Sequence, residues 1–212
     1  MSAAASAAGG AENAASDDAG VGVGVGVGVG EVDGVDGVAG VAAVAEVAGA
    51  DAVDAVAAVD AVWLARAIEL ATLNVADGGG PFGAVVVRDG ILLAEGQNRV
   101  TATLDPTAHA EVSAIRAACQ RIGDFSLAGS TLYTSCEPCP LCLAAALWAR
   151  IDRIVFAADR HDAARGGFDD LEFYELFARD RADWTMHVEA LRLPNAPEPF
   201  DAWLASEGRT DY

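Results

Sequence analysis

The sequence predicts an α/β layered domain preceded by a low-complexity tail. From Asp60 onward, stretches with helical periodicity alternate with apolar strand-like runs, in the order helix, strand, strand, helix, strand, helix, strand. Residues 1–59, in contrast, consist mostly of alanine, glycine, valine and acidic residues. A chain of 212 residues is long enough for one domain of ordinary size and such a tail. We therefore place the tail at residues 1–59 and the domain at residues 60–212.

The tail has a composition that favours disorder. Residues 21–30 repeat Val-Gly five times, and alternating glycine is costly to order in a helix or a strand. We expect residues 1–40 to be disordered, whereas valines that recur at every third residue predict a frayed helical lead-in over residues 41–59. An expanded coding repeat without function is the favoured interpretation, because the tail contains no recognisable motif. An arm that binds a partner is the alternative.

A helix and a β-hairpin open the domain. Apolar residues at helical spacing predict a helix through about residue 76 with one apolar face, formed by Val62, Leu64, Ala67, Ile68, Ala71 and Val75. The Gly-Gly-Gly-Pro run at residues 78–81 ends this helix. Residues 82–87 then form a predicted buried strand, Asp89-Gly90 a hairpin turn, and residues 91–94 the returning strand.

The rest of the domain alternates loops, helices and strands. We predict a polar loop at residues 97–106, helices at 108–122 and 141–150, and strands at 131–134 and 153–157. Further along the chain we predict a loop at 159–170, a helix at 171–178, a last strand at 184–193 and a short helix at 200–206. In such a sheet a site is expected beyond the strand ends, where two helix N-termini meet.

One histidine, one glutamate and two cysteines form the most informative pattern in the chain. His109 and Glu111 lie two positions apart, and Cys139 and Cys142 follow Pro138 with two residues between them. This H-x-E … P-C-x-x-C spacing is the established signature of zinc-dependent deaminases. Cysteines three positions apart share one helix face, and the N–H groups of a helix N-terminus favour the thiolate form.

These residue types fit a catalytic zinc ion. Such an ion needs three protein ligands and one open position for water, and His109, Cys139 and Cys142 supply the three ligands. Zinc lowers the pKa of the bound water, so that hydroxide is available near neutral pH. In the first turn of a helix that begins at His109, Glu111 can transfer protons without binding the metal. We therefore predict one zinc ion per subunit.

Other interpretations of the cysteines stay open. A C-x-x-C pair alone can be redox-active or half of a structural zinc site, and Cys136 forms a second such pair with Cys139. Its position is more consistent with the end of a buried strand. A structural zinc ion usually has four protein ligands, and no fourth ligand has motif spacing in this sequence. A non-catalytic interaction domain is therefore the alternative to an enzyme.

The charge of the chain bears on its partners and its compartment. Acidic residues number 32 and basic residues 13, all of them arginine, which gives a net charge of −19. Binding to a phosphate backbone requires a basic patch, so we expect a small-molecule substrate and no nucleic acid. Four cysteines without a disulfide-scaffold pattern, and no secretory signal, predict a cytoplasmic protein. Acidic residues interrupt the Val/Ala-rich run at 38–62, so no membrane span is expected.

The domain resembles the cytidine-deaminase-like superfamily and, within it, the small zinc-dependent guanine deaminases of bacteria. The resemblance covers residues 63–212 and rests on a terminal tyrosine, Tyr212, and on five segments, at residues 79–85, 95–98, 105–112, 133–140 and 167–170. Many deaminases share the zinc motif. The Gly-Phe-Asp-Asp loop at 167–170 and the terminal tyrosine are narrower signals.

The resemblance implies a fold and an assembly. The fold is a three-layer α/β/α arrangement with a five-stranded mixed sheet. The assembly is a homodimer with exchanged C-terminal segments, so that each segment covers the active site of the other subunit. In this arrangement a purine ring would lie between Phe82 and the partner subunit's Tyr212.

The resemblance also implies residue roles and a reaction. Asn98 would hydrogen-bond the purine, and Trp148 would line the pocket. Asp170 would contact the amino side of guanine and help to move protons. Core packing is the alternative for Phe82 and Trp148, and a solvated loop carboxylate or helix cap for Asp170.

The implied reaction is the hydrolytic deamination of guanine to xanthine and ammonia. Zinc-bound hydroxide would attack C2, and Glu111 would carry the water proton to N3 and then to the departing amine. Alternative substrates are guanosine, cytosine, ammeline or another aminated heterocycle. Adenosine in tRNA is a further alternative, which the net charge of −19 disfavours.

Overall fold

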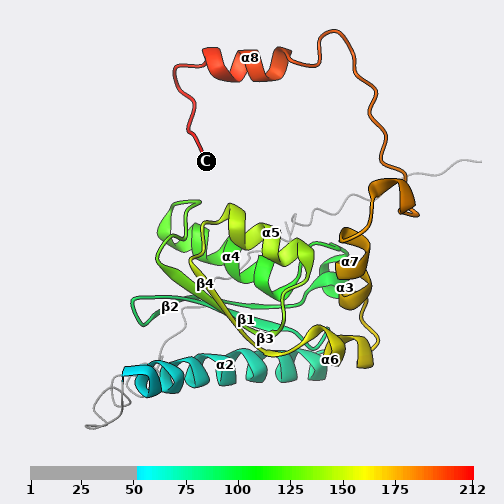
Figure 1. Ribbon diagram of the computed structural model, residues 1–212. Helices are drawn as coiled ribbons and strands as arrows, with labels where there is room; N and C mark the ends of the chain where they lie inside the picture. Colours follow the sequence, from blue (N-terminus) through cyan, green and yellow to red (C-terminus); the bar gives the residue numbers. More distant parts are fainter. Residues whose placement is uncertain (1–51) are drawn as a thin grey trace, which may run out of the picture. The chain divides into compact units, whose positions relative to one another are not determined.

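The computed structural model describes residues 52–212, and their core is a mixed β-sheet between helices (Figure 1). The sheet has the strand order β2-β1-β3-β4, formed by β1 (Gly83–Arg88), β2 (Ile91–Gln97), β3 (Ser130–Cys136) and β4 (Arg153–Ala158). β1 pairs antiparallel with β2 and with β3, whereas β3 and β4 are parallel. The predicted α/β class and the mixed sheet are confirmed.

Helices cover both faces of this sheet. Helix α2 (Ala52–Ala76) packs on one face, and helices α4 (Ala110–Ile122) and α5 (Pro140–Trp148) pack on the other (Figure 1). Successive side chains of a strand point to opposite faces. β1 therefore contributes Val85 to the apolar core under α2 and Val86 to the core under α4 and α5. The result is a helix–sheet–helix layer order.

The hairpin between β1 and β2 has the predicted turn. Asp89 and Gly90 both have positive φ, at 53° and 73°, as a two-residue hairpin turn requires. β2 continues to Gln97, three residues beyond the predicted end of the strand. Gly96 allows β2 to lie directly against α4, because a Cβ atom at this position would lie 2.5 Å from the backbone nitrogen of Ala114. β2 therefore ends beside the start of α4.

Helix α2 is longer than predicted and buries only part of the predicted face, including Ala67 and Ala71. It begins at Ala52 and so crosses the boundary placed between residues 59 and 60. Its buried stripe consists of Trp63, Ala67, Leu70, Ala71 and Asn74. Much of the predicted face is exposed, namely Val62, Ile68 and Val75. The helix is apolar on several sides, so apolar spacing alone does not identify the buried one. The predictions for residues 1–51 lie outside the described residues.

The predicted fifth strand at residues 184–193 is wrong. Beyond Ala158, the described chain contains helices, a 3₁₀ helix at Arg181–Asp183 and irregular segments, but no strand. A strand requires a hydrogen-bonded neighbour, and within residues 52–212 this segment has none. Its apolar side chains stay exposed, among them Met186 and Val188. The sheet therefore has four strands rather than five, and within the described chain nothing pairs with the outer edge of β4.

Short helices occupy segments that were predicted as loops. They are α3 (Val100–Thr103) and α6 (Arg160–Arg165), and the predicted C-terminal helices are α7 (Asp170–Phe177) and α8 (Glu198–Ala205). α6 starts after Asp159, whose carboxylate accepts hydrogen bonds from the N–H groups of residues 161 and 162. Helices of four and six residues are too short to show a periodic pattern. None of the helices in the described part of the chain has both the length and the apolar character of a membrane span.

Candidate zinc site

The histidine and the glutamate of the motif lie at the start of helix α4. His109 is the N-cap residue, with extended backbone angles (φ −67°, ψ 158°), and Glu111 lies in the first turn. The turn before the helix is held by Asp105, whose carboxylate accepts hydrogen bonds from the N–H and the hydroxyl group of Thr107. The imidazole and the carboxylate are therefore presented by the same helix end.

The two cysteines lie at the start of helix α5. Cys139 is the N-cap residue, and Pro140 occupies the first helical position, where a backbone N–H is not needed. Cys142 follows three residues later, and both thiols are buried. The unpaired N–H groups of a helix N-terminus favour negatively charged sulfur. The chain therefore presents two potential thiolates opposite His109.

The three donor atoms have the spacing of a tetrahedral zinc site. His109 Nδ1 lies 3.5 Å from Cys139 Sγ and 3.5 Å from Cys142 Sγ, and the two sulfur atoms are 3.7 Å apart. Ligands bound to one zinc ion at about 2.0–2.3 Å with tetrahedral angles lie about 3.5–3.8 Å from one another. Within residues 52–212, no fourth histidine, cysteine or acidic side chain joins this group. The donors thus fit a zinc ion that keeps one position for water.

The protonation of the thiols also favours a cation. The hydrogen bond with Cys142, more than the one with His109, lowers the pKa of Cys139 to about 4. The Cys139 thiolate in turn raises the pKa of Cys142, and burial raises it further. Two buried sulfur atoms at this distance both ionise only when a positive ion lies between them. Zn²⁺ bound by His109, Cys139 and Cys142 meets this requirement.

Two carboxylic acids flank the metal ligands, and both have raised pKa values. Burial raises the pKa of Glu111, which is 5% exposed, to about 7. Burial also raises the pKa of Asp170, and the Cys139 thiolate adds to this effect. Asp170 is the first residue of α7 and follows the N-cap residue Asp169. The pKa of about 7 suits Glu111 to general acid–base catalysis near neutral pH.

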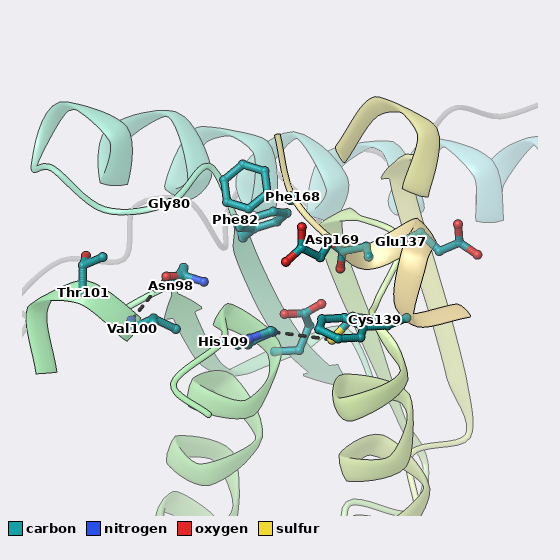
Figure 2. A pocket seen from close by; sticks show the side chains of 13 residues that line it. Gly80, Phe82, Asn98, Val100, Thr101, His109, Glu137, Cys139, Phe168 and Asp169 are labelled. Atoms are coloured by element: carbon teal, nitrogen blue, oxygen red, sulfur yellow. Dashed lines mark hydrogen bonds between the residues drawn. The ribbon is translucent and has the colours of Figure 1, made fainter. Parts of the chain in front are cut away.

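A cavity of about 270 Å³ opens beside the metal ligands (Figure 2). Its walls are formed by Gly80, Phe82, Asn98, Val100, Thr101, His109, Glu111, Glu137, Cys139, Phe168, Asp169, Asp170 and Phe173. The rings of Phe82 and Phe168 form an edge contact, with 4.7 Å between the ring centroids and 80° between the planes. Figure 2 shows these two rings above His109 and Cys139, with Asn98 to one side. Aromatic walls with a few polar groups suit a flat polar ring.

Most of the predicted site residues meet at this cavity. Those that line it are Phe82, Asn98, His109, Glu111, Cys139 and Asp170, and Cys142 completes the donor group. The side-chain oxygen of Asn98 accepts a hydrogen bond of 3.3 Å from the Val100 N–H. This bond fixes which end of the amide faces Val100.

Trp148 and Tyr212 do not line the cavity within the single chain. Trp148 is the last residue of α5, at the opposite end from the zinc ligands, and its ring centroid lies 5.7 Å from that of Tyr212. Together with Phe125 and residues of α4 they line a separate groove of about 690 Å³. Both side chains are largely exposed, Trp148 at 61% and Tyr212 at 69%. The role predicted for Tyr212 requires a second chain, so the structure of one chain does not test it.

Seven residues line the cavity without having been predicted as site residues, and three of them have large side chains, namely Glu137, Phe168 and Phe173. Glu137 lies inside the Cys-Glu-Pro-Cys segment and Phe168 inside the Gly-Phe-Asp-Asp loop, so their place in these motifs was the available signal. Phe173 comes from the exposed side of α7, and no pattern in the sequence marks it. Glu137 forms an ion pair with Arg160, and hydrogen bonds from this arginine lower its pKa.

Cys136 does not belong to the metal donor group. It ends β3, and its thiol donates a hydrogen bond to the carbonyl oxygen of Asp159 at 3.5 Å. Burial raises its pKa to about 12, which keeps the thiol protonated. The donor group found in residues 52–212 contains Cys139 and Cys142 but not Cys136. The structure therefore favours the Cys139–Cys142 pair over the Cys136–Cys139 pair as metal ligands.

Known proteins share this sequence pattern. Residues 58–158 match the family described as the cytidine and deoxycytidylate deaminase zinc-binding region. Guanine deaminase of Bacillus subtilis (strain 168) is 47% identical over 151 residues, which are 71% of this chain and 97% of that protein. A tRNA-specific adenosine deaminase of Agrobacterium fabrum is 46% identical over 78 residues, which are 37% of this chain and 51% of that protein.

Solved structures show that the similarity extends to the fold. The X-ray structure of guanine deaminase from Bacillus subtilis superposes with a TM-score of 0.68 and 47% sequence identity, over 71% of this chain and 96% of that chain. The guanine deaminase of Nitrosomonas europaea superposes with a TM-score of 0.50 and 34% identity, over 51% of this chain and 64% of that chain. The similarity therefore includes both the metal-binding motif and the layers that hold it.

Proposed function

Because the chain belongs to the family of zinc-binding cytidine and deoxycytidylate deaminases, we propose that it catalyses the hydrolytic deamination of guanine to xanthine and ammonia. The central observation is a three-donor zinc group next to a buried glutamate, at a cavity lined by aromatic rings. The relative that this chain covers almost completely is a guanine deaminase. This match supports guanine, rather than another aminated ring, as the substrate.

Glu111 carries out the proton transfers of the proposed reaction. Zinc held by His109, Cys139 and Cys142 supplies a Lewis acid that lowers the pKa of a water molecule. Glu111 takes a proton from the water that adds to C2 of guanine and delivers it to N3. It then delivers the second proton to the amino group, which leaves as ammonia while the C2 carbonyl of xanthine forms. A pKa of about 7 suits a carboxyl group that must accept and donate in one cycle.

Recognition of the base falls to the opposite wall of the cavity. Asn98 donates a hydrogen bond from Nδ2 to the purine, because its Oδ1 already accepts from Val100. The face of the Phe82 ring stacks on the base, and the edge contact with Phe168 holds that ring in place. Asp170 contacts the amino side of the base and assists the proton transfers, for which its raised pKa suits it.

We further propose a cytoplasmic homodimer in which each C-terminal segment covers the partner's site. The outer edge of β4 is unpaired within the described residues. Beyond Asp183, large apolar side chains are exposed, namely Met186, Val188, Leu191, Leu193, Phe200, Trp203 and Leu204. A monomer rarely leaves so many apolar side chains in water, whereas a second copy can cover them. Tyr212 would then close the partner's cavity over the base.

A substrate panel tests the proposed activity. Zinc-loaded protein is offered guanine, guanosine, cytosine, ammeline, adenine and a tRNA anticodon stem-loop, and the release of ammonia is measured. We expect the highest kcat/KM for guanine. A higher kcat/KM for another compound would show that this compound, and not guanine, is the preferred substrate. The similarity to the tRNA-specific enzyme is limited to 78 residues, and the net charge of −19 opposes binding to a phosphate backbone.

A further inference from the structure

A fully buried asparagine of helix α2 lies behind the base-recognition wall of the cavity. Asn74 is 0% exposed and occupies the stripe of α2 that faces the sheet, among Leu70 and Ala71. A polar side chain at such a position is costly unless it makes hydrogen bonds. The zinc chemistry makes no use of Asn74, because this residue is neither a metal donor nor a lining residue of the cavity. The two partners of its Nδ2 explain why a polar group stands there, whereas its Oδ1 has no hydrogen-bond partner within the described residues.

The amide group of Asn74 connects two segments that line the cavity. Its Nδ2 donates one hydrogen bond to the carbonyl oxygen of Gly80 and another to that of Asn98, each 2.8 Å long. Gly80 belongs to the loop after α2, whereas Asn98 follows β2, and both line the cavity. A single amide therefore uses both of its protons to fix the backbone on this side of the site.

The space around the amide leaves it little freedom. A Cβ atom on Gly79 would lie 2.6 Å from Cγ of Asn74, so the loop passes directly over the amide. A Cβ atom on Gly80 would lie 3.3 Å from Cγ of Asn98. The side chains of Asn74 and Asn98 are thus packed on either side of the same glycine loop.

We propose that Asn74 is a positioning residue that fixes the Asn98 amide and thereby sets the affinity for the base. This inference rests on the proposed function, in which Asn98 donates to the purine. Leucine at position 74 has the same branching but cannot donate, and it removes the Asn74 hydrogen bonds to the carbonyl groups of Gly80 and Asn98. Aspartate would place carboxylate oxygens against carbonyl oxygens. Of these three side chains, only the asparagine amide supplies the two N–H donors that the Gly80 and Asn98 carbonyl groups accept.

A double-mutant cycle tests the proposal. Asn74→Leu is measured alone and combined with Asn98→Ala, with guanine as substrate and with zinc content recorded. Alone, Asn74→Leu raises KM about tenfold and changes kcat less than about threefold, because it disturbs binding rather than proton transfer. In the Asn98→Ala background it changes KM less than about twofold, because the group that it positions is already absent.

A control and a second variant complete the test. Tyr133→Phe removes another hydrogen bond of α2, the 2.8 Å bond from the Tyr133 hydroxyl to Asp60, which lies away from the cavity. It is expected to lower the melting temperature without changing KM. If Asn74→Leu does not fold, Asn74→Ser keeps one donor and is expected to show a smaller rise in KM with the same dependence on Asn98.

The possible outcomes separate this inference from the proposed function. If wild-type protein does not deaminate guanine, both are overturned. If wild-type protein is active and Asn74→Leu raises KM equally with and without Asn98, only the positioning role of Asn74 is overturned. An unchanged KM for Asn74→Leu, or a loss confined to kcat and zinc content, overturns it as well.

Discussion

The hydroxyl group of Tyr174 donates a 2.6 Å hydrogen bond to the carbonyl oxygen of Pro138, the residue directly before the zinc ligand Cys139. The ring of Tyr174 also lies against Arg160, with 3.5 Å between the guanidinium carbon and the ring centroid. Tyr174 belongs to α7, the helix that begins with Asp170. This contact therefore connects the helix that presents the second carboxyl group to the loop that presents the first zinc-binding thiol.

Removal of the Tyr174 hydroxyl should loosen the zinc site. Tyr174→Phe keeps the ring on Arg160 but leaves the buried Pro138 carbonyl without its partner, at a cost of about 1–2 kcal/mol in the free energy of unfolding. We expect faster transfer of zinc to a chromophoric chelator, together with a lower midpoint in urea unfolding. Tyr133→Phe, which acts away from the zinc site, serves as the control. Equal rates of zinc release from wild type and Tyr174→Phe would contradict this role.

The ion pair between Glu137 and Arg160 predicts a pH-dependent contribution to stability. Hydrogen bonds from Arg160 hold the pKa of Glu137 below its ordinary value of 4.5. A carboxyl group whose pKa is lowered by folding stabilises the folded state above its ordinary pKa, and this stabilisation is lost as the pH falls through its folded-state pKa. The difference in unfolding free energy between wild type and Glu137→Gln should therefore be constant from pH 7 to about 5 and shrink at lower pH.

Urea unfolding at a series of pH values measures this difference. Glu172→Gln, on the exposed side of α7, is the matched control, and its difference from wild type should stay close to zero throughout. A difference for Glu137→Gln that keeps its neutral-pH value down to about pH 3 would show that the ion pair does not stabilise the fold in this way.

Asp170 should contribute to turnover rather than to metal binding. Asp170→Asn keeps the shape of the side chain but removes its ionisable proton, so we expect kcat to fall about 10²-fold with zinc content unchanged. Asp169→Asn removes a neighbouring charge at the same cavity and should lower kcat less than about tenfold. Steady-state kinetics with zinc analysis of both variants measures the difference. Equal losses for the two variants would mean that charge, and not proton transfer, explains the effect.

Exchange of the C-terminal segments predicts complementation between two defective subunits. Glu111→Gln lacks the proton-transferring group, and Tyr212→Ala lacks the side chain proposed to cover the partner's site. In a mixed dimer one site contains an intact Glu111 and receives an intact tyrosine from the other subunit. Co-expression of the two variants should therefore restore roughly a quarter of the wild-type activity, because half of the dimers are mixed and each has one complete site. No recovery would contradict a role of Tyr212 across the interface.

The zinc-binding half of the site could be predicted from the sequence because its geometry is local. A histidine at a helix start and a glutamate two positions later must share that helix end, and a Pro-Cys-x-x-Cys segment behaves in the same way at α5. The hairpin was also predictable, because Asp89-Gly90 permits few other turns. Motif spacing was therefore sufficient to predict the zinc ligands, and the Asp-Gly turn was sufficient to predict that the first two strands pair as a hairpin.

The parts that were missed depend on non-local packing. Residues 184–193 have an alternating pattern that suits a strand, but within the described chain no neighbour pairs with them. The face of α2 was only partly assigned because apolar residues surround much of the helix, and Asn74 was overlooked on the buried side. Trp148 does not line the cavity of its own chain, and its predicted role in a dimer stays a prediction. The periodicity of one segment does not indicate which other part of the protein that segment packs against.

The proposed deamination of guanine depends on Glu111 beside a zinc ion held by His109, Cys139 and Cys142. The most direct test compares ammonia release from guanine by zinc-loaded wild type and by Glu111→Gln that contains the same amount of zinc. We predict turnover by the wild type and a loss of about 10²–10⁴-fold in kcat for the variant. A wild-type protein that releases no ammonia would contradict the proposed activity, and a Glu111→Gln variant that retains full activity would contradict the role of Glu111.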